Sequence, residues 1–453
     1  MGMFSFINFS HSILACSCVG LVFERKVVVI TAIIFAPKQK LSLLFLLTGK
    51  NMSMFCLSIL WCFMQKERYL TQSIIPDLSD KMVFIGGARQ VGKTTLAREI
   101  IAKSYPNSTY YNWDYRPDRK KITSTELPGE SGLLIFDEIH KFKKWKNFVK
   151  GIYDTNKDKY KILVTGSARL NIYRKSGDSL QGRYHYYTLH PFTLAELELI
   201  KNKWTPFEEL NFNAQSSREN FETLFKFGGF PEPLIAQSAR TLRRWHNEKH
   251  ERLFREDVRD LENIRDINSM KLLGDMLPSK VGSQLSLNAI KEDLGISHRA
   301  VTSWLNILES FYYHFRIYPY TSNVIRSIRK EPKLFLIDWS EVENESARFE
   351  NLIASNLLKF TNYLVEHEGF KCSLHYLRNL DKKEVDFLIA VDAKPWFAVE
   401  VKLSETLTSK NLKYFKERLH IPFSYQVVKQ SDVDIFRDDV RIISADKFLS
   451  GLV

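Results

Sequence analysis

The chain of 453 residues is longer than a single hydrophobic core usually supports, so we expect two or three domains. Its 44% hydrophobic and 26% charged residues exclude an intrinsically disordered protein. The net charge of +13 favours a polyanionic partner, although a solvated basic surface is the commoner explanation. The five cysteines show no zinc-ligand spacing, which predicts a reduced, cytoplasmic protein without a zinc site.

Residues 1–63 differ in composition from the rest of the chain, because Phe, Leu, Ile, Ser and Cys dominate and acidic residues are nearly absent. No stable membrane insertion is expected, since every apolar run is shorter than the roughly 18 to 20 residues that span a bilayer. Those runs are His11–Phe23, Val27–Pro37, Leu41–Thr48 and Met52–Met64. Met1–Ser10 also lacks the basic residue of a signal peptide. We interpret 1–63 as an atypical extension with Met64 as the candidate start, and a weak membrane anchor is the alternative.

The next segment, 64–192, contains an apolar run that leads into a G-x-x-x-x-G-K-T motif and then into the helix-like Leu96–Ile100. This order is typical of a nucleoside triphosphate site. Two glycines let the loop turn its N–H groups toward the phosphates, and the helix adds its positive end. Lys93 is expected at the β and γ oxygens, and the Thr94 hydroxyl is expected to bind Mg²⁺. The residues expected to bind ATP are Gly87, Ala88, Arg89, Gln90, Val91, Gly92, Lys93, Thr94 and Thr95.

Two further strands are predicted after this loop, at Ser108–Asp114 and Ser131–Glu138. The second is a continuous apolar run that ends in two carboxylates, as expected for a strand buried in a parallel sheet. Its carboxyl end lies where ligands bind in such sheets. We expect Asp137 to hold Mg²⁺ through water and Glu138 to polarise the attacking water, a role that favours hydrolysis over nucleotide kinase activity.

The strand predicted at Tyr160–Ala168 ends in small polar residues. Ser167 or Thr165 is a candidate to contact the γ-phosphate or to orient water, and an ordinary strand-to-loop turn is the alternative. Arg183 precedes another strand-like run. It is a candidate arginine finger for its own or a neighbouring subunit, although pairing with nearby Asp178 is equally consistent with the sequence.

Six segments together resemble the prokaryotic AAA+-type ATPases that carry a restriction-endonuclease-like carboxy-terminal domain of unknown function. The resemblance covers about residue 66 to the end and implies a cytoplasmic ATP-binding protein. It also supports Met64 as the start. The segments that carry it are Phe84–Thr95, Leu134–His140, Leu163–Ala168, Ser179–Arg183, His190–Glu196 and Gly228–Pro233.

A helical lid is expected over 193–263, where charged and apolar residues alternate at helical spacing. The family resemblance makes Arg255 or Arg259 a candidate for nucleotide contact, and a solvated helix face is the simpler interpretation.

A winged-helix-like module is expected over 264–329. Gly295 fits the turn between its helices, Ser297 fits the second cap, and Phe311–Tyr320 would form the wing. Few basic residues beyond Arg299 mark the second helix, so contact with DNA and a packing role both stay open.

Residues 330–453 resemble the PD-(D/E)xK nuclease core. Glu350 lies on a predicted helix, and a hairpin would bring Asp386 beside Glu400 and Lys402, which share one face of a strand. The three carboxylates are candidate Mg²⁺ ligands, and Lys402 is a candidate to orient water or stabilise the phosphorane. An inactive copy that keeps these residues for salt bridges is the main alternative.

The predicted fold class is therefore α/β: a P-loop AAA+-type ATPase core with a helical lid, a winged-helix module and a restriction-endonuclease-like domain. The predicted function is an ATP-hydrolysing switch that uses ATP and Mg²⁺ and acts on DNA or RNA, with a homo-oligomer as a candidate assembly. The competing prediction is a regulatory or scaffold protein that binds ATP and a protein partner and has an inactive nuclease fold.

Overall fold

The computed structural model describes residues 15–24, 27–36, 39–47, 68–167, 170, 180–212, 216–258, 266–321, 331–404 and 407–453. The chain divides into two compact units, residues 1–64 and residues 65–453.

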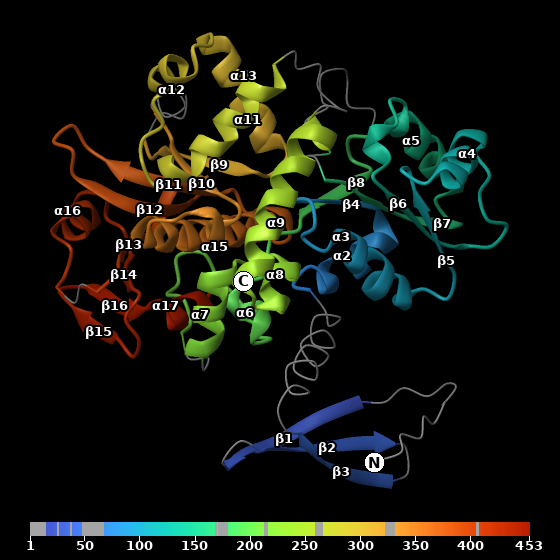
Figure 1. Ribbon diagram of the computed structural model, residues 1–453, viewed down its shortest axis with the longest axis horizontal. Coiled ribbons are helices and arrows are strands. Elements are labelled where there is room, and N and C mark those ends of the chain that lie inside the picture. Colours follow the sequence, from blue (N-terminus) through green and yellow to red (C-terminus); the bar gives the residue numbers. More distant parts are fainter. Residues whose placement is uncertain are drawn as a thin grey trace. The chain divides into compact units, whose positions relative to one another are not determined.

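The first unit contains an antiparallel sheet in the order β1-β2-β3 (Figure 1). Its strands are β1 (Ala15–Glu24), β2 (Val27–Ala36) and β3 (Gln39–Leu47). Three of the four apolar runs therefore contribute to strands, which their β-branched residues favour, and the fourth, Met52–Met64, lies outside the described residues. Among the described helices of the chain, none is long and apolar enough to cross a membrane.

The second unit begins with a parallel five-stranded sheet in the order β5-β6-β7-β4-β8. Its strands are β4 (Met82–Gly86), β5 (Ser108–Asn112), β6 (Gly132–Asp137), β7 (Tyr160–Thr165) and β8 (Tyr184–Thr188). Because β7 lies between β4 and β6, the carboxyl ends of these three strands meet at one edge, where an open parallel sheet binds ligands.

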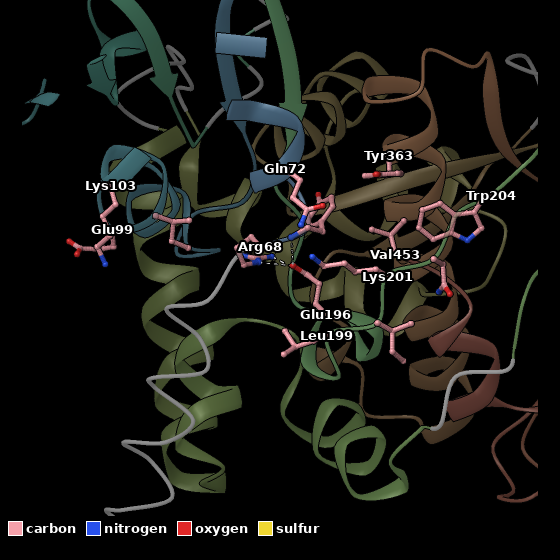
Figure 2. A pocket seen from close by; sticks show the side chains of 14 residues that line it. Arg68, Gln72, Glu99, Lys103, Glu196, Leu199, Lys201, Trp204, Tyr363 and Val453 are labelled. Carbon is pink, nitrogen blue, oxygen red and sulfur yellow. Dashed lines mark hydrogen bonds and ion pairs between the residues drawn. The ribbon is translucent and has the colours of Figure 1, made fainter. Parts of the chain in front are cut away.

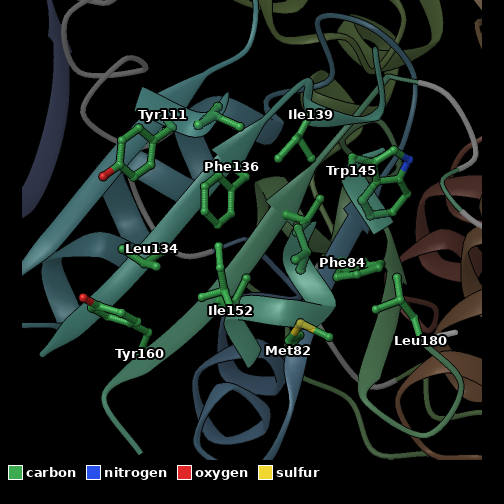
Figure 3. Packing of buried hydrophobic residues seen from close by; sticks show 14 of the residues in the cluster. Met82, Phe84, Tyr111, Leu134, Phe136, Ile139, Trp145, Ile152, Tyr160 and Leu180 are labelled. Carbon is green, nitrogen blue, oxygen red and sulfur yellow. The ribbon is translucent and has the colours of Figure 1, made fainter. Parts of the chain in front are cut away.

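Helices α2 (Thr71–Asp80), α4 (Arg116–Ser124) and α5 (Trp145–Asn156) accompany this sheet. Aromatic and aliphatic side chains from α5 and the strands form its core (Figure 3), in which the rings of Phe84 and Trp145 lie 5.6 Å apart. Burial of such large side chains fixes the strand ends in position and therefore fixes the loops that follow them.

The expected lid region is helical. It contains α6 (Leu194–Leu197), α7 (Arg218–Phe227), α8 (Pro231–Ala236), α9 (Ala239–Arg252) and a π-helical turn at Leu253–Val258. Side chains of Ser217 and Ser238 cap α7 and α9. Arg255 is exposed and pairs with Glu251 of the same helical segment, whereas Arg259 lies outside the described residues.

The expected helix pair is formed by α12 (Leu287–Leu294) and α13 (His298–Ser310), preceded by α11 (Ile267–Met276). Gly295 ends α12 with a φ of 64°, and the Ser297 side chain caps α13 by accepting from Ala300 N. Residues of the expected wing, Phe311–Tyr320, form β9 (His314–Pro319), which is a strand of a larger sheet. The winged-helix interpretation stays a prediction.

That larger sheet has eight strands in the order β10-β9-β11-β12-β13-β14-β16-β15. The remaining strands are β10 (Lys333–Leu336), β11 (Cys372–Arg378), β12 (Glu384–Val391), β13 (Lys394–Lys402), β14 (Phe423–Val428), β15 (Asp434–Arg437) and β16 (Val440–Ser444). Because β9 pairs with both β10 and β11, the sheet crosses the boundary that was expected between 329 and 330.

The long helix α15 (Glu345–Glu366) packs on strands β10 to β13 and also contacts β8 of the parallel five-stranded sheet (Figure 1). The shorter helices α16 (Lys410–Leu419) and α17 (Ala445–Ser450) complete this region. The predicted hairpin is formed by β12 and β13. Its turn residues Asp392 and Ala393 have φ values of 49° and 60°, as a tight hairpin turn requires.

Candidate functional site

The glycine-rich loop reverses the chain between β4 and the short helix α3 (Lys93–Thr95), which continues as a π-helical turn at Leu96–Ile100. Gly87 and Gly92 have φ values of 148° and 103°. A Cβ atom on Gly87 would lie 2.4 Å from the carbonyl oxygen of Leu189. The loop therefore needs glycine there, both for its backbone conformation and for its close approach to the end of β8.

Lys93 lies inside this loop and is 6% exposed. Its ammonium donates to the carbonyl oxygens of Gly87 at 2.9 Å and Ala88 at 2.8 Å. Both acceptors are neutral, so phosphate oxygens can replace them without leaving a buried charge unpaired. The helix that starts at Lys93 presents backbone N–H groups at its amino end, where anions bind.

Asp137, at the end of β6, accepts hydrogen bonds from three hydroxyl groups. Thr94 and Tyr110 each lie 2.7 Å from its Oδ2 atom, and Thr165 donates to Oδ1. Burial, followed by the charge of Asp137, raises the pKa of Tyr110, so this phenol stays a neutral donor. The structure thus brings the predicted residues Thr94 and Asp137 together, and it adds Tyr110, which the sequence analysis missed.

Glu138 follows β6 in a left-handed conformation with φ 54°. Its Oε2 atom accepts from Ser167 Oγ at 3.2 Å and lies 3.6 Å from His140 Nε2 and 3.9 Å from Lys141 Nζ. Burial lowers the pKa of His140 and favours its neutral form. Of the two candidates at the end of β7, Ser167, just after the strand, contacts Glu138, whereas Thr165, its last residue, contacts Asp137.

Arg183 directly precedes β8 and lies at the amino ends of the parallel strands, opposite the glycine-rich loop. Its carbonyl oxygen accepts from Met82 N at the start of β4, whereas the loop follows the end of β4. Its guanidinium pairs with Asp154 of α5, with N–O distances of 2.8 and 3.3 Å. The placement of Arg183 corrects the expectation that it reaches the triphosphate of its own subunit. The other suggested partner, Asp178, lies outside the described residues.

Arg68, which precedes α2, ties the loop to the rest of the unit. Its guanidinium donates to the carbonyls of Val91 at 3.1 Å and His190 at 2.6 Å, and it pairs with Glu196 at 2.8 Å. Glu196 also pairs with Lys359 of α15. This chain of contacts runs from the glycine-rich loop to the helix that packs on the eight-stranded sheet.

The Arg68, Glu196 and Lys359 side chains form a buried triad with two cations and one carboxylate. Burial would raise the pKa of Glu196, but the charges of Arg68 and Lys359 lower it to about 2. Burial lowers the pKa of Lys359 to about 8, and Arg68 opposes its protonation while Glu196 supports it. One carboxylate cannot fully neutralise two cations, and the uncompensated positive charge disfavours the protonated form of Lys359.

A cavity of about 510 Å³ opens beside this triad (Figure 2). Arg68 and Gln72, from the start of α2 and the residues before it, line one side of the cavity, and Trp204 and Tyr363 line the opposite side. Arg68 lines the cavity and also donates to the carbonyl of Val91 in the glycine-rich loop, so the cavity lies next to the loop. Aromatic walls with nearby cations are suited to a planar ligand that carries negative charge.

A second polar cluster lies on the eight-stranded sheet, around an amino group that the sequence analysis did not identify. Lys333 Nζ at the start of β10 lies 2.6 Å from Glu384, 3.3 Å from Glu350 and 3.6 Å from Asp386. Burial would lower the pKa of Lys333, but the charges of Glu350, Asp386 and Glu384 outweigh it and raise the pKa. The ammonium is thus held between Glu350 and Asp386, two of the three carboxylates that were expected to bind a metal.

The other predicted residues lie beside this cluster. Asp386 Oδ2 accepts from Val401 N at 2.9 Å, and Lys402 Nζ pairs with Glu400 Oε1 at 3.0 Å. Burial and the charge of Asp386 raise the pKa of Glu350 to about 8 and that of Glu400 to about 7.

The described residues contain no group of three carboxylate, histidine or cysteine side chains arranged to hold a metal ion. Lys333 pairs with Glu350 and Asp386, and Lys402 pairs with Glu400, so each of the three carboxylates has a lysine partner and their role as Mg²⁺ ligands stays a prediction.

Three family models match successive parts of the chain. Residues 79–198 match the AAA domain, residues 218–342 match a domain of unknown function, DUF8612, and residues 345–448 match another, DUF4143. The first match covers the parallel sheet with its glycine-rich loop. These residues are therefore similar to a P-loop AAA domain, a fold that binds ATP.

Relatives are found in archaea and bacteria. The uncharacterized protein MJ1544 of Methanocaldococcus jannaschii is 25% identical over 78% of this chain and 82% of its own length. The uncharacterized protein Rv2008c of Mycobacterium tuberculosis is 21% identical over 72% of this chain and 71% of its own length. Among solved structures, a variant of RuvB from Thermotoga maritima is 19% identical, covers 59% of this chain and 89% of its own, and has a TM-score of 0.28, too low to support an argument.

Proposed function

We propose that this chain is a Mg²⁺-dependent ATPase that uses hydrolysis to switch between conformations. The observation that supports this most directly is that Thr94 and Asp137 lie 2.7 Å apart at the sheet edge where Ser167 contacts Glu138. A hydroxyl and a carboxylate supply the hard oxygen ligands that Mg²⁺ prefers. When bound, Mg²⁺ would neutralise charge on the triphosphate.

The chain's own residues take separate roles in this proposal. Lys93 exchanges its two loop carbonyls for β and γ oxygens. Glu138 accepts the proton of the attacking water, and Ser167 orients its carboxylate by donating to it. A nucleotide kinase is the less favoured alternative, because a carboxylate in this position suits a water nucleophile better than a second phosphate.

The proposal is tested by measuring ATP binding and ATP turnover in the wild type and in Glu138→Gln. We expect binding to stay within about threefold and turnover to fall by on the order of 10²-fold or more, because the amide cannot accept the proton. Glu130→Gln, at an exposed position before β6, is the matched control and should change neither quantity. Unchanged turnover in Glu138→Gln would remove Glu138 from the mechanism and revive the kinase alternative.

We also propose that the nucleoside part of ATP occupies the cavity beside Arg68. Gln72 lines this cavity from the exposed face of α2, so a larger side chain there fills space without entering the core. Gln72→Trp should weaken binding of ATP but not of inorganic tripolyphosphate, and Gln72→Ala should spare both. Equal weakening of the two ligands by Gln72→Trp would contradict this placement.

For the target of the switch, nucleic acid stays a prediction. Arg299 is exposed at the start of α13, where a recognition helix would contact DNA. ATP turnover with single-stranded DNA, double-stranded DNA and RNA should rise in the wild type and rise less in Arg299→Ala. The absence of stimulation and of binding with all three would favour a protein partner.

The scaffold alternative has one observation in its favour. Lys333 lies between the carboxylates that a nuclease would use for its metal, as expected of an inactive copy of such a fold. We therefore propose that the eight-stranded sheet contributes binding rather than cleavage. Metal-dependent cleavage of any single- or double-stranded nucleic acid, lost in Asp386→Asn, would refute this assignment.

A further inference from the structure

His140 is a buried side chain to which the proposed reaction gives no role. It lies in the short 3₁₀ helix Ile139–Lys141, directly after Glu138, and is 5% exposed. Neither of its ring nitrogens has a hydrogen-bond partner among the described residues. Such burial is disfavoured, because both nitrogens lose the hydrogen bonds that water would make. An unpartnered polar ring beside the candidate general base therefore calls for an explanation.

The position of the imidazole ring is set by its packing. A Cβ atom on Gly166, directly after β7, would lie 2.7 Å from Nδ1 of His140. The ring therefore lies against the backbone of Gly166, the residue before Ser167, and leaves no room for a side chain there unless the ring shifts. Packed in this way, the ring presents Nε2 to Glu138, at 3.6 Å from the Oε2 atom.

Three polar groups approach the same oxygen of Glu138. Ser167 donates to Oε2 at 3.2 Å, and His140 Nε2 and Lys141 Nζ lie 3.6 and 3.9 Å from this atom. Within the described part of the chain, no donor bonds to Oε1. The carboxylate is thus approached from one side, and Oε1 is the oxygen left to accept the proton of the attacking water.

The imidazole of His140 is suited to donate without adding a charge. Burial lowers its pKa, and the charge of Lys141 opposes protonation while that of Glu138 supports it. A neutral imidazole keeps one N–H donor. The separation of 3.6 Å is too long for a hydrogen bond, and a movement of roughly 0.6 Å would bring the two atoms to the usual distance. Catalytic hydrogen bonds that are long without substrate commonly tighten when substrate binds.

We propose that His140 is a positioning residue for Glu138: its Nε2–H donates to Oε2 when ATP is bound and, together with Ser167, holds the carboxylate with Oε1 toward the attacking water. The inference rests on the proposed ATPase function and adds a second donor to it. Glu138 accepts the proton of water, and His140 keeps its own proton throughout. Since His140 acts through Glu138, its loss lowers the rate of hydrolysis and leaves the affinity for ATP unchanged.

The test measures kcat and KM for ATP in the full chain with three substitutions of His140. His140→Gln places an amide nitrogen near the position of Nε2, His140→Asn places one near Nδ1, and His140→Phe keeps a ring without a donor. We expect kcat to fall by about 10- to 100-fold in His140→Phe and His140→Asn, but to stay within about fivefold of the wild type in His140→Gln. KM should change by less than about threefold in all three variants.

Stability separates positioning from packing. His140→Phe replaces a buried polar ring by an apolar one, so its Tm should stay within about 2 °C of the wild type or rise while kcat falls. In a Glu138→Gln background, His140→Phe should lower turnover by less than about twofold more, because both substitutions act on the same carboxylate.

Three results would overturn the inference in a wild type that hydrolyses ATP: unchanged kcat in His140→Phe, a loss in His140→Gln as large as in His140→Asn, or losses that multiply with that of Glu138→Gln. If His140→Phe does not fold, the comparison of His140→Gln with His140→Asn carries the test. A wild type that binds ATP without hydrolysing it would refute the proposed function and this inference together, whereas the first three results leave that function intact.

Discussion

The two buried lysines, Lys93 in the glycine-rich loop and Lys333 on the eight-stranded sheet, are alike in burial but differ in their partners. Lys93 donates to two neutral carbonyl oxygens, whereas Lys333 lies among three carboxylates. Carbonyl acceptors can be exchanged for a ligand because no charge is left behind, but carboxylates that lose their only shared cation repel one another. We therefore expect the ammonium of Lys93 to be more readily available to a ligand than that of Lys333.

The largest expected effect is a difference in ATP affinity between variants of the two lysines. Lys93→Ala should weaken ATP binding by about 10²-fold or more, because a charge-assisted contact to the phosphates is lost. Lys333→Ala should leave ATP affinity within about threefold, since Lys333 lies on the other sheet. Titration with a fluorescent ATP analogue measures both. Equal losses in the two variants would mean that the lysines act on one site, which would end the comparison.

The next largest expected effect is a difference in how much the loss of each lysine lowers the free energy of unfolding. Lys333→Met should lower the free energy of unfolding by about 2 to 4 kcal/mol, because it leaves buried carboxylates without their cation. Lys93→Met should lower it by less, about 1 kcal/mol, because the carbonyl oxygens of Gly87 and Ala88 that accept from Lys93 are neutral. Denaturant unfolding of both variants, without divalent metal, provides the measurement. Lys383→Met is the control for the loss of a surface lysine.

A reversed order, with Lys93→Met the more destabilising, would show that the loop depends on its lysine for folding and would contradict the idea that its carbonyl contacts are readily exchanged.

The different nature of these partners also explains what the sequence could predict. Lys93 and Thr94 belong to one short motif, and Asp137 ends an apolar strand, so strand-end geometry alone brings them together. Lys333 is the first residue of a strand with an ordinary sequence, and its partners are set by the order β10-β9-β11-β12, which depends on long-range packing. No local spacing in the sequence marks such a partner.

One other assignment depends on long-range pairing in the same way. Phe311–Tyr320 has the local pattern of a wing, but the same pattern also fits β9 between two strands, and only tertiary pairing decides. Arg183 is a different case, because it precedes a parallel strand. The sequence already placed it at the amino edge of the sheet, opposite the loop, and this signal was available but unused.

A third prediction concerns the triad, the only contact chain described above that links the glycine-rich loop to α15. Tyr69 faces Lys359 at 4.0 Å, and Thr193 accepts from it at 3.0 Å. The pKa of Lys359 is lowered to about 8 in the folded state, against about 10.4 when unfolded. The unfolded state therefore binds more protons between these values, and stability should rise as pH increases from about 8 to 10.4.

Lys359→Met should remove this rise, which we expect to be about 1 to 3 kcal/mol. Denaturant unfolding at about pH 8 and about pH 10.4 measures it. Glu196 behaves in the opposite range, because its pKa is lowered to about 2 and its stabilising contribution is lost only as pH falls below about 4.5. An alkaline rise that persists in Lys359→Met would assign the titration to another group.

The smallest expected effect concerns the nucleotide site, where three neutral hydroxyl groups donate to the carboxylate of Asp137. Tyr110→Phe removes one of three hydroxyls that donate to Asp137 and should weaken Mg²⁺-dependent ATP binding by about fivefold, the equivalent of about 1 kcal/mol. Tyr111→Phe is the matched control on the same strand, because its hydroxyl donates to the carbonyl of Glu126 instead. Binding of ATP in EDTA should be the same in both variants, since the Tyr110 hydroxyl acts through the carboxylate that holds the metal. If Tyr110→Phe weakens binding equally with and without Mg²⁺, then Tyr110 supports the loop as a whole and not the metal ligand, and the three hydroxyls cannot be treated as a shell that positions Asp137.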